Sequence, residues 1–164
     1  MAIQRGHKFR IESDEAFPQK LILLGSITQK MKYNPDPRAL PEPVFDIDRE
    51  GQGTGLPVWV ASVTDPHEGA EGRAARASFQ IEFVASHQPV PVTDEIVPGT
   101  GMRMIELEGL TAEPTVVRQG SGDKNFSYVA YRFRASGIKG DTSGAKQAPN
   151  DPGASRPASS KAAA

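Results

Sequence analysis

The stretch RASFQIEFVAS, residues 76–86, alternates between apolar and polar side chains through its middle. Phe79, Ile81 and Phe83 fall on one side of an extended chain, because successive side chains of a strand point to opposite faces. The polar residues between them fall on the other side. This period of two predicts a β-strand with one buried and one solvated face.

Four other segments have the composition of strands: residues 19–31, 56–65, 102–117 and 125–138. Gly25 interrupts the first of them, which predicts a bulge or a sharp bend. Loops rich in proline and glycine separate the segments, and PHEGAEGRAA (residues 66–75) is expected to be a loop tip. Five strands without a long helix predict a mostly β protein, built as a small barrel or a sandwich.

The last of these segments combines aromatic and basic side chains. Val129, Tyr131 and Phe133 share one face of a strand and are expected to lie in the core. Arg132 and Arg134 share the opposite face. That face is either a solvated exterior or a surface that contacts a ligand.

The 164 residues suit one domain with less regular ends. Residues 141–164 contain no aromatic residue and no valine, isoleucine, leucine or methionine, so they cannot offset the entropy of ordering and are expected to form a disordered tail. The expected organisation is an N-terminal extension over residues 1–18, a β-domain over residues 19–140, and this tail.

Composition excludes several classes of function. The net charge is −1, from 19 basic and 20 acidic residues, so a nucleic-acid site would have to be a local basic patch. The absence of cysteine excludes a disulfide framework and a cysteine-based zinc site. The first residues contain no apolar signal region, and the longest uninterrupted aliphatic run is LILL, residues 21–24. The expected location is the cytoplasm, without membrane contact.

The residue spacing does not fit the metal-binding and catalytic motifs that the sequence partly resembles. DIDREG, residues 46–51, resembles the start of a calcium loop, but the twelfth position is Pro57 instead of glutamate. His7, His67 and His87 lie far apart, and no nucleophile and base are paired in the sequence. We therefore expect no enzyme, cofactor or metal. A hydrolase would require His67 or His87 to meet a carboxylate in a pocket.

Three segments resemble the bacterial single-stranded-DNA-binding protein family. KLILLGSITQKMKYNPDP (residues 20–37), VPGTGMRMIELEGLTAE (97–113) and YVAYRFRASGIK (128–139) look like its first, fourth and closing strands, in that order. The resemblance covers residues 19–140. It departs from the family in the longer, proline-rich loop after the first strand and in the tail end SSKAAA, where the family has an acidic, apolar tip. This indicates a divergent relative, such as one encoded by a phage or mobile element.

The resemblance implies a five-stranded OB-type barrel and a homo-oligomer that binds single-stranded DNA in replication or recombination. Such binding needs aromatic faces for base stacking and cations for phosphates. The candidates are Lys30, Lys32, Tyr33, Trp59, Arg73, Arg76, Arg103, Phe126, Tyr128, Arg132 and Arg134.

Each candidate also has an ordinary structural interpretation. Trp59 stands between Val58 and Val60 and suits a core equally well, and Arg73 and Arg76 suit a solvated loop. The alternative function is therefore an OB-like or sandwich-like protein-interaction or structural module that does not bind nucleic acid.

Overall fold

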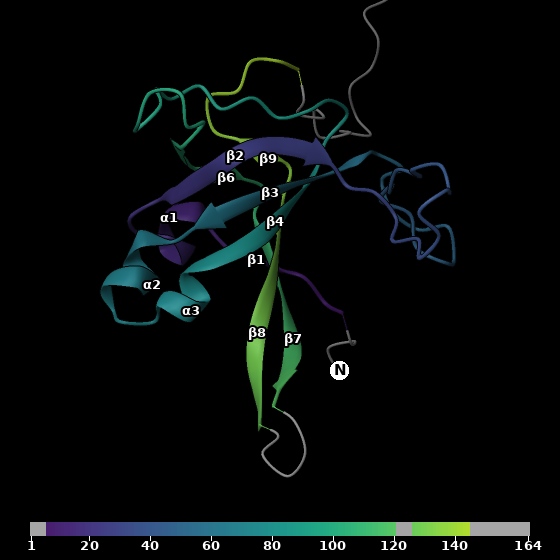
Figure 1. Cartoon of the computed structure of the whole chain (residues 1–164), viewed down its shortest axis with the longest axis horizontal. Coiled ribbons are helices and arrows are strands. Elements are labelled where there is room, and N and C mark those ends of the chain that lie inside the picture. Colours follow the sequence, from purple (N-terminus) through teal and green to yellow (C-terminus); the bar gives the residue numbers. More distant parts are fainter. Residues whose placement is uncertain (1–5, 121–125, 145–164) are drawn as a thin grey trace, which may run out of the picture.

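A computed structural model describes residues 6–120 and 126–144, except for the side chains of Ala74, Ala75, Gln119 and Phe126. The protein is mostly β, as the alternation predicts (Figure 1). The elements in chain order are β1 (Phe9–Arg10), α1 (Ser13–Ala16), β2 (Leu21–Gln29), β3 (Val58–Thr64), α2 (Pro66–Ala70), α3 (Ala74–Ala77), β4 (Ser78–Val84), β5 (Arg103–Ile105), β6 (Leu107–Glu108), β7 (Thr111–Gln119), β8 (Phe126–Ala135) and β9 (Gly137–Ile138).

The strands form a seven-stranded sheet in the order β1-β7-β8-β4-β3-β2-β5 and a two-stranded sheet of β6 and β9. Only the β4–β8 pairing in the larger sheet is parallel. The expectation of five strands was too low. The segment 102–117 divides into β5, β6 and β7, the segment 125–138 contains β8 and β9, and β1 lies before the first expected segment. In this order β1 and β5 form the ends, so the pairing of the described strands gives no closed barrel.

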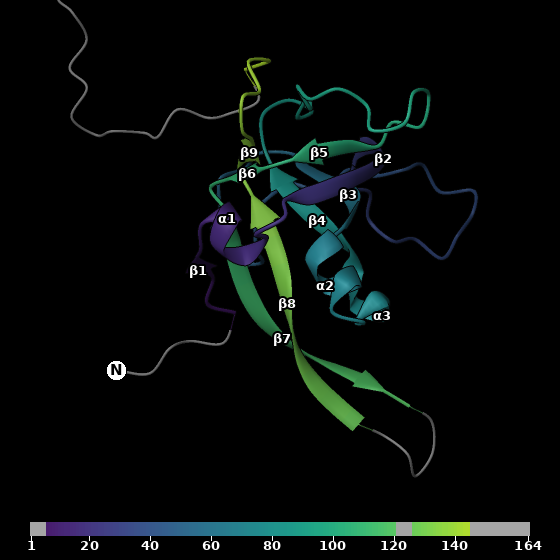
Figure 2. The ribbon, with the colours of Figure 1, turned by 90° about the vertical axis from the view of Figure 1, so that its left-hand side faces the viewer.

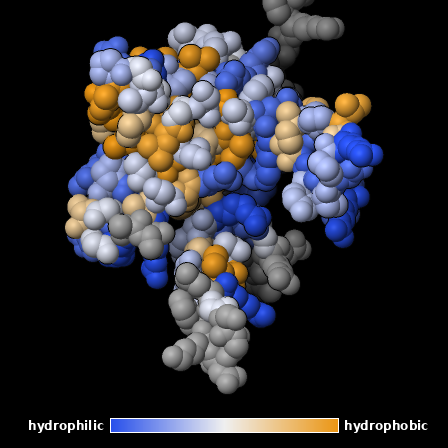
Figure 3. All heavy atoms as spheres, in the orientation of Figure 1, coloured by the Kyte–Doolittle hydropathy of each residue, from blue (hydrophilic) through white to orange (hydrophobic). Residues whose placement is uncertain are grey.

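The core lies on one face of β2, β3 and β4. Ile81 and Phe83 are fully buried there with Leu21 and Val63, as the alternation of β4 predicts. Phe17 also belongs to this core, although it precedes residue 19, where we expected the domain to begin. On the opposite side of β2, alternate apolar residues are half-buried, and Figure 3 shows apolar side chains gathered over β2 and β3.

The prediction of a bulge or a sharp bend at Gly25 is confirmed as a shift in strand register. The residue has φ +80°, in the left-handed region that favours glycine, and the register between β2 and β3 shifts between Leu24 and Thr28. The first half of β2 pairs with both β3 and β5, and its second half pairs with β3 and leads into a long connection.

The expectation of a loop tip at residues 66–75 was wrong, because two short helices begin there. The carboxylate of Asp65 accepts a hydrogen bond of 2.9 Å from the backbone N–H of His67, and Pro66 occupies the first helical turn. An aspartate followed by proline is a recognised start of a helix. α2 and α3 therefore cover one end of the sheet (Figure 2).

β7 and β8 extend away from the body as a two-stranded ribbon (Figures 1 and 2). β4 pairs with β8 only at Glu82 and Phe83, near the end of β8. Consequently Phe133 packs against the core, whereas Val129 is 61% exposed and Tyr131 is 57% exposed. The prediction that Val129 and Tyr131 lie in the core was wrong.

The chain stays ordered beyond the domain boundary expected at residue 140. Asp141 is only 7% exposed, and its carboxylate accepts hydrogen bonds from the backbone N–H groups of Val90 and Ser143. Residues 145–164 of the expected tail lie outside the described residues. None of the helices in the described ranges is long and apolar enough to cross a membrane.

Candidate nucleic-acid interface

Residues 30–57, between β2 and β3, form a projecting segment that we call the arm. Its base is an extended pair, in which the N–H of Val44 donates to the carbonyl of Lys30 at 2.8 Å and that of Lys32 donates to the carbonyl of Glu42 at 2.7 Å. Beyond this pair, Tyr33 is 92% exposed and Leu40 is 89% exposed. Figure 3 shows the arm as mainly hydrophilic at one side of the body.

A second lobe of the arm is fixed to the sheet through Asp46. The hydroxyl and N–H of Thr54 both donate to one carboxylate oxygen of Asp46, at 2.8 and 3.1 Å. The other oxygen accepts a hydrogen bond of 2.7 Å from Arg134 on β8. Gly53 makes this turn feasible, because it has φ +135° and a Cβ atom there would overlap the carbonyl oxygen of Asp46.

Glu82 connects the arm's base to β8 across the sheet. One carboxylate oxygen accepts a hydrogen bond from the ammonium group of Lys30, and the other accepts one of 2.8 Å from Arg134. Glu82 lies opposite Arg134 in the parallel β4–β8 pair. The result is a chain of alternating charges, Lys30, Glu82, Arg134 and Asp46, which we call the charge network.

Both carboxylates of the charge network titrate below their ordinary range. Burial raises the pKa of Glu82, but hydrogen bonds and positive charge from Lys30 and Arg134 outweigh burial and hold the pKa below its usual 4.5. Burial likewise raises the pKa of Asp46, and hydrogen bonds from Thr54 with the charge of Arg134 bring it below 3.8. Both carboxylates are therefore charged at neutral pH.

A hollow of about 500 Å³ lies beside the charge network, between the arm and β4 and β8. Its ionisable lining residues are Lys8, Lys30, Asp46, Asp48, Glu82 and Arg134. Basic and acidic side chains are equal in number, so the hollow has no net charge. In the described ranges, no group of histidine and acidic side chains is arranged to hold a metal ion.

Two further basic candidates lie on the same side of β8. The guanidinium of Arg76, from α3, lies 5.0 Å from the ring centre of Tyr128, a cation–π arrangement. Arg132 is exposed and makes no ion pair with the described residues. The structure thus brings together five sequence candidates on one face: Lys30, Arg76, Tyr128, Arg132 and Arg134.

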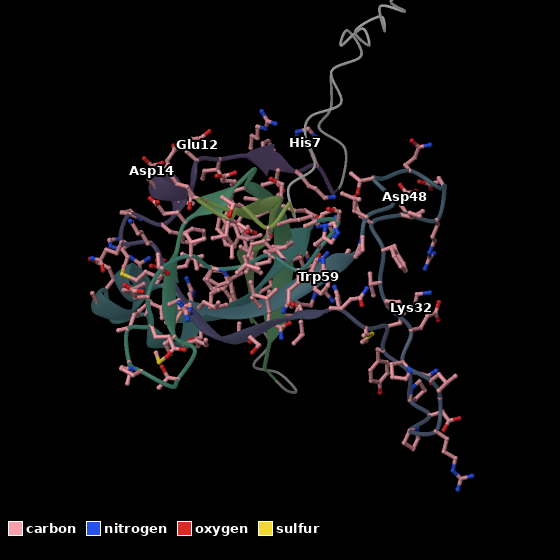
Figure 4. All side chains as sticks on the ribbon, turned by 90° about the horizontal axis from the view of Figure 1, so that it is seen from above. His7, Glu12, Asp14, Lys32, Asp48 and Trp59 are labelled. Atoms are coloured by element: carbon pink, nitrogen blue, oxygen red, sulfur yellow. The ribbon has the colours of Figure 1, made fainter. Side chains whose placement is uncertain are left out.

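The remaining candidates lie elsewhere. Trp59 is half-buried against the core at the base of the arm, and its indole N–H donates to the carbonyl of Ala85 at 3.0 Å. Lys32 is on the arm, paired with Glu42, next to Tyr33 (Figure 4).

Two of the arginine candidates are separated from the charge network. Arg73 pairs with Glu68 at 3.0 Å near the short helices. Arg103 is on β5, with β2 and β3 between it and β4, and it contacts Glu95 at 3.7 Å. The side chain of Phe126 is outside the described part of the chain.

Sequence reasoning missed the two carboxylates that organise this face. Glu82 was recognised only as a solvated position of an alternating strand, and Asp46 only as part of a rejected calcium loop. The pairing of Glu82 with Arg134 depends on the parallel register of β4 and β8, which are far apart in sequence.

The chain was compared with protein families, curated proteins and solved structures. No family model, no curated protein and no solved structure matches this chain.

Proposed function

We propose that this protein binds single-stranded DNA with little sequence preference, in the cytoplasm, during replication or recombination. The binding surface is the outer face of β4 and β8 together with the arm. The observation that carries the proposal is the convergence of five sequence candidates on that face. Aromatic stacking and contacts from lysine and arginine to phosphates would supply the binding, without a cofactor or chemical step.

The proposal includes an OB-type arrangement of the strands. β5 pairs with β2, and β7, which five residues separate from β5, pairs with β8. We propose that residues 103–119 act as one bent strand of a distorted five-stranded OB-type barrel. In such barrels, nucleic acids bind to the second and third strands and to the loops after the first and fourth strands. The corresponding parts among the described residues are β3, β4 and the arm.

The test is a titration of a labelled oligothymidine, followed by fluorescence anisotropy at several salt concentrations. We expect saturable binding that weakens as salt rises, because each phosphate contact releases a counterion. Arg132→Gln should weaken binding and reduce the slope of log K against log salt by about 0.7, the value for one contact to a single strand.

Arg103→Gln is the matched control, because it removes the same charge at the far side of β2 and β3. Its salt slope should equal that of the wild type. A flat wild-type titration would refute the proposed function, and equal losses in both variants would refute the location of the surface.

The proposal also includes a homo-oligomer. Val116, Val129 and Tyr131 leave exposed apolar surface on the ribbon, which is the kind of surface that protein interfaces cover. The same observation favours the second candidate function, a protein-interaction module without DNA binding. No binding of oligothymidine at any salt concentration would favour that module.

A further inference from the structure

Glu82 links two basic residues of the proposed face, Lys30 and Arg134. Only 12% of its side chain is exposed, and its two oxygens accept hydrogen bonds from Lys30 and Arg134. A phosphate group has the same features, since it is a compact anion with several acceptor oxygens. Glu82 therefore satisfies these cations in the way that a phosphate of DNA would.

The other acidic member of the charge network has a different role. Asp46 accepts two hydrogen bonds from Thr54 in addition to the one from Arg134, so it is held by its own lobe of the arm. Glu82 lies on a regular strand and has no such turn around it. Of the two carboxylates, Glu82 can release its cations without unfolding a turn.

The electrostatics of the hollow indicate that DNA cannot use these cations while Glu82 holds them. Lys8, Lys30 and Arg134 face an equal number of carboxylates, so an incoming phosphate meets no net positive charge. An ion pair that is partly shielded from water is screened less by salt than an exposed pair. The anion already present must be displaced before Lys30 and Arg134 contact a phosphate.

We propose that Glu82 is an intramolecular competitor for phosphate, which occupies Lys30 and Arg134 in the free protein and which single-stranded DNA displaces on binding. This rests on the proposed function and adds its regulation. Glu82 keeps the affinity of the face low and its dependence on salt shallow. Single-stranded DNA contacts Lys30 and Arg134 only when it also binds the neighbouring Arg132 and the arm.

The experiment compares Glu82→Gln with the wild type in the oligothymidine titration. Removing the carboxylate's charge raises the net charge with which the hollow meets DNA by one, which has the effect of one more phosphate contact. The slope of log K against log salt should steepen by about 0.7. When salt is lowered from about 1 M to about 50 mM, the affinity of Glu82→Gln should therefore rise roughly eightfold more than the affinity of the wild type.

Glu106→Gln is the matched control. Glu106 also bridges two cations, Lys20 at 3.7 Å and Lys139 at 3.4 Å, and its loss changes the net charge equally. The control should bind as the wild type does. An equal gain in both variants would show a general charge effect and overturn the inference.

The outcomes separate this inference from the proposed function. Binding by the wild type with no gain in Glu82→Gln overturns the inference alone, whereas flat titrations with every protein overturn the proposed function and the inference with it. A measurement on the wild type covers the case in which Glu82→Gln fails to fold. The carboxyl carbon-13 resonance of Glu82 should shift saturably as oligothymidine is added, and that of Glu106 should not. Equal behaviour of the two resonances also overturns the inference.

Discussion

Glu82 and Asp46 couple the stability of the fold to pH. Their folded-state pKa values lie below the ordinary values of 4.5 and 3.8, so each carboxylate contributes stability that is present at neutral pH. That contribution is lost as the pH falls below the ordinary values and through the folded ones. Near pH 7, the charged hydrogen bonds of Glu82 should contribute roughly 1–3 kcal/mol to the free energy of unfolding.

We therefore predict that Glu82→Gln lowers the free energy of unfolding at pH 7 and makes it less dependent on pH. Urea unfolding between pH 7 and pH 3 measures both effects. The stability of the wild type should decline more steeply than that of the variant below about pH 4.5, and the two curves should converge in acid. Parallel curves over this range would contradict the lowered pKa of Glu82.

The sequence gives incomplete information about individual residues. The period of two in β4 correctly predicts that Ile81 and Phe83 are buried, because that pattern depends only on local geometry. Phe79 is only partly buried, and the side chain of Glu82, on the face predicted to be solvated, is 12% exposed. The same rule failed for Val129 and Tyr131. The rule assumes that a core packs against one face of the strand, and this part of the ribbon extends beyond the core. The partner of Arg134 required a tertiary register that no local pattern contains.

At the scale of elements, the arm depends on one turn. Gly53 has φ +135° and lies against the carbonyl of Asp46, whereas Gly51 has φ +79° and open space around it. Gly53→Ala should therefore add a steric clash to the backbone strain that Gly51→Ala introduces. We predict a loss of roughly 1–2 kcal/mol for Gly51→Ala and more for Gly53→Ala.

Amide hydrogen exchange measures this prediction locally. The N–H groups of Asp46 and Gly55, which bond across the base of the lobe, should exchange faster in Gly53→Ala than in Gly51→Ala. Amides of β4 should be affected less than those of the arm. Equal exchange in the two variants would mean that the close approach of Gly53 to the carbonyl of Asp46 does not affect the stability of this lobe.

All five strand segments expected from the sequence contain strands, because alternation and flanking turn residues indicate them locally. The short helices were missed because α2 and α3 have four or five residues, too few to show a helical period. The Asp65–Pro66 start was the available signal, and it was read as part of a loop. The break between β6 and β7 falls at Gly109, where a Cβ atom would overlap the side chain of Ser136.

At the scale of the whole molecule, the order of the strands was beyond local patterns. A period of two fixes the faces of a strand but not its neighbours, and the parallel β4–β8 pair joins segments about 50 residues apart. The resemblance supplied an expected order. It did not predict that the pairing of the described strands would end at β1 and β5 or that the ribbon would leave the body. The proposed binding face depends on that order, because β8 brings Arg134 beside Glu82.

The exposed apolar face of the ribbon is the surface through which we expect the protein to self-associate. Val116 and Val129 are direct partners across β7 and β8, and both are more than half exposed. A two-stranded ribbon with an uncovered apolar face is marginally stable in water, so covering it by another copy would stabilise both. We predict self-association that increases with protein concentration. Changing both valines to threonine should weaken it, because threonine keeps the shape and strand preference while adding a hydroxyl.

Sedimentation velocity over a range of concentrations tests this, with Val117→Thr as the control on the opposite face of β7. A wild type that stays monomeric would remove the homo-oligomer from the proposal. Association that persists unchanged in the double variant would instead place the interface elsewhere, and the half-buried apolar side chains over β2 and β3 would be the next surface to substitute. Association and DNA binding use different faces of β8 in this proposal. The double variant should therefore retain the salt slope of the wild type per bound chain.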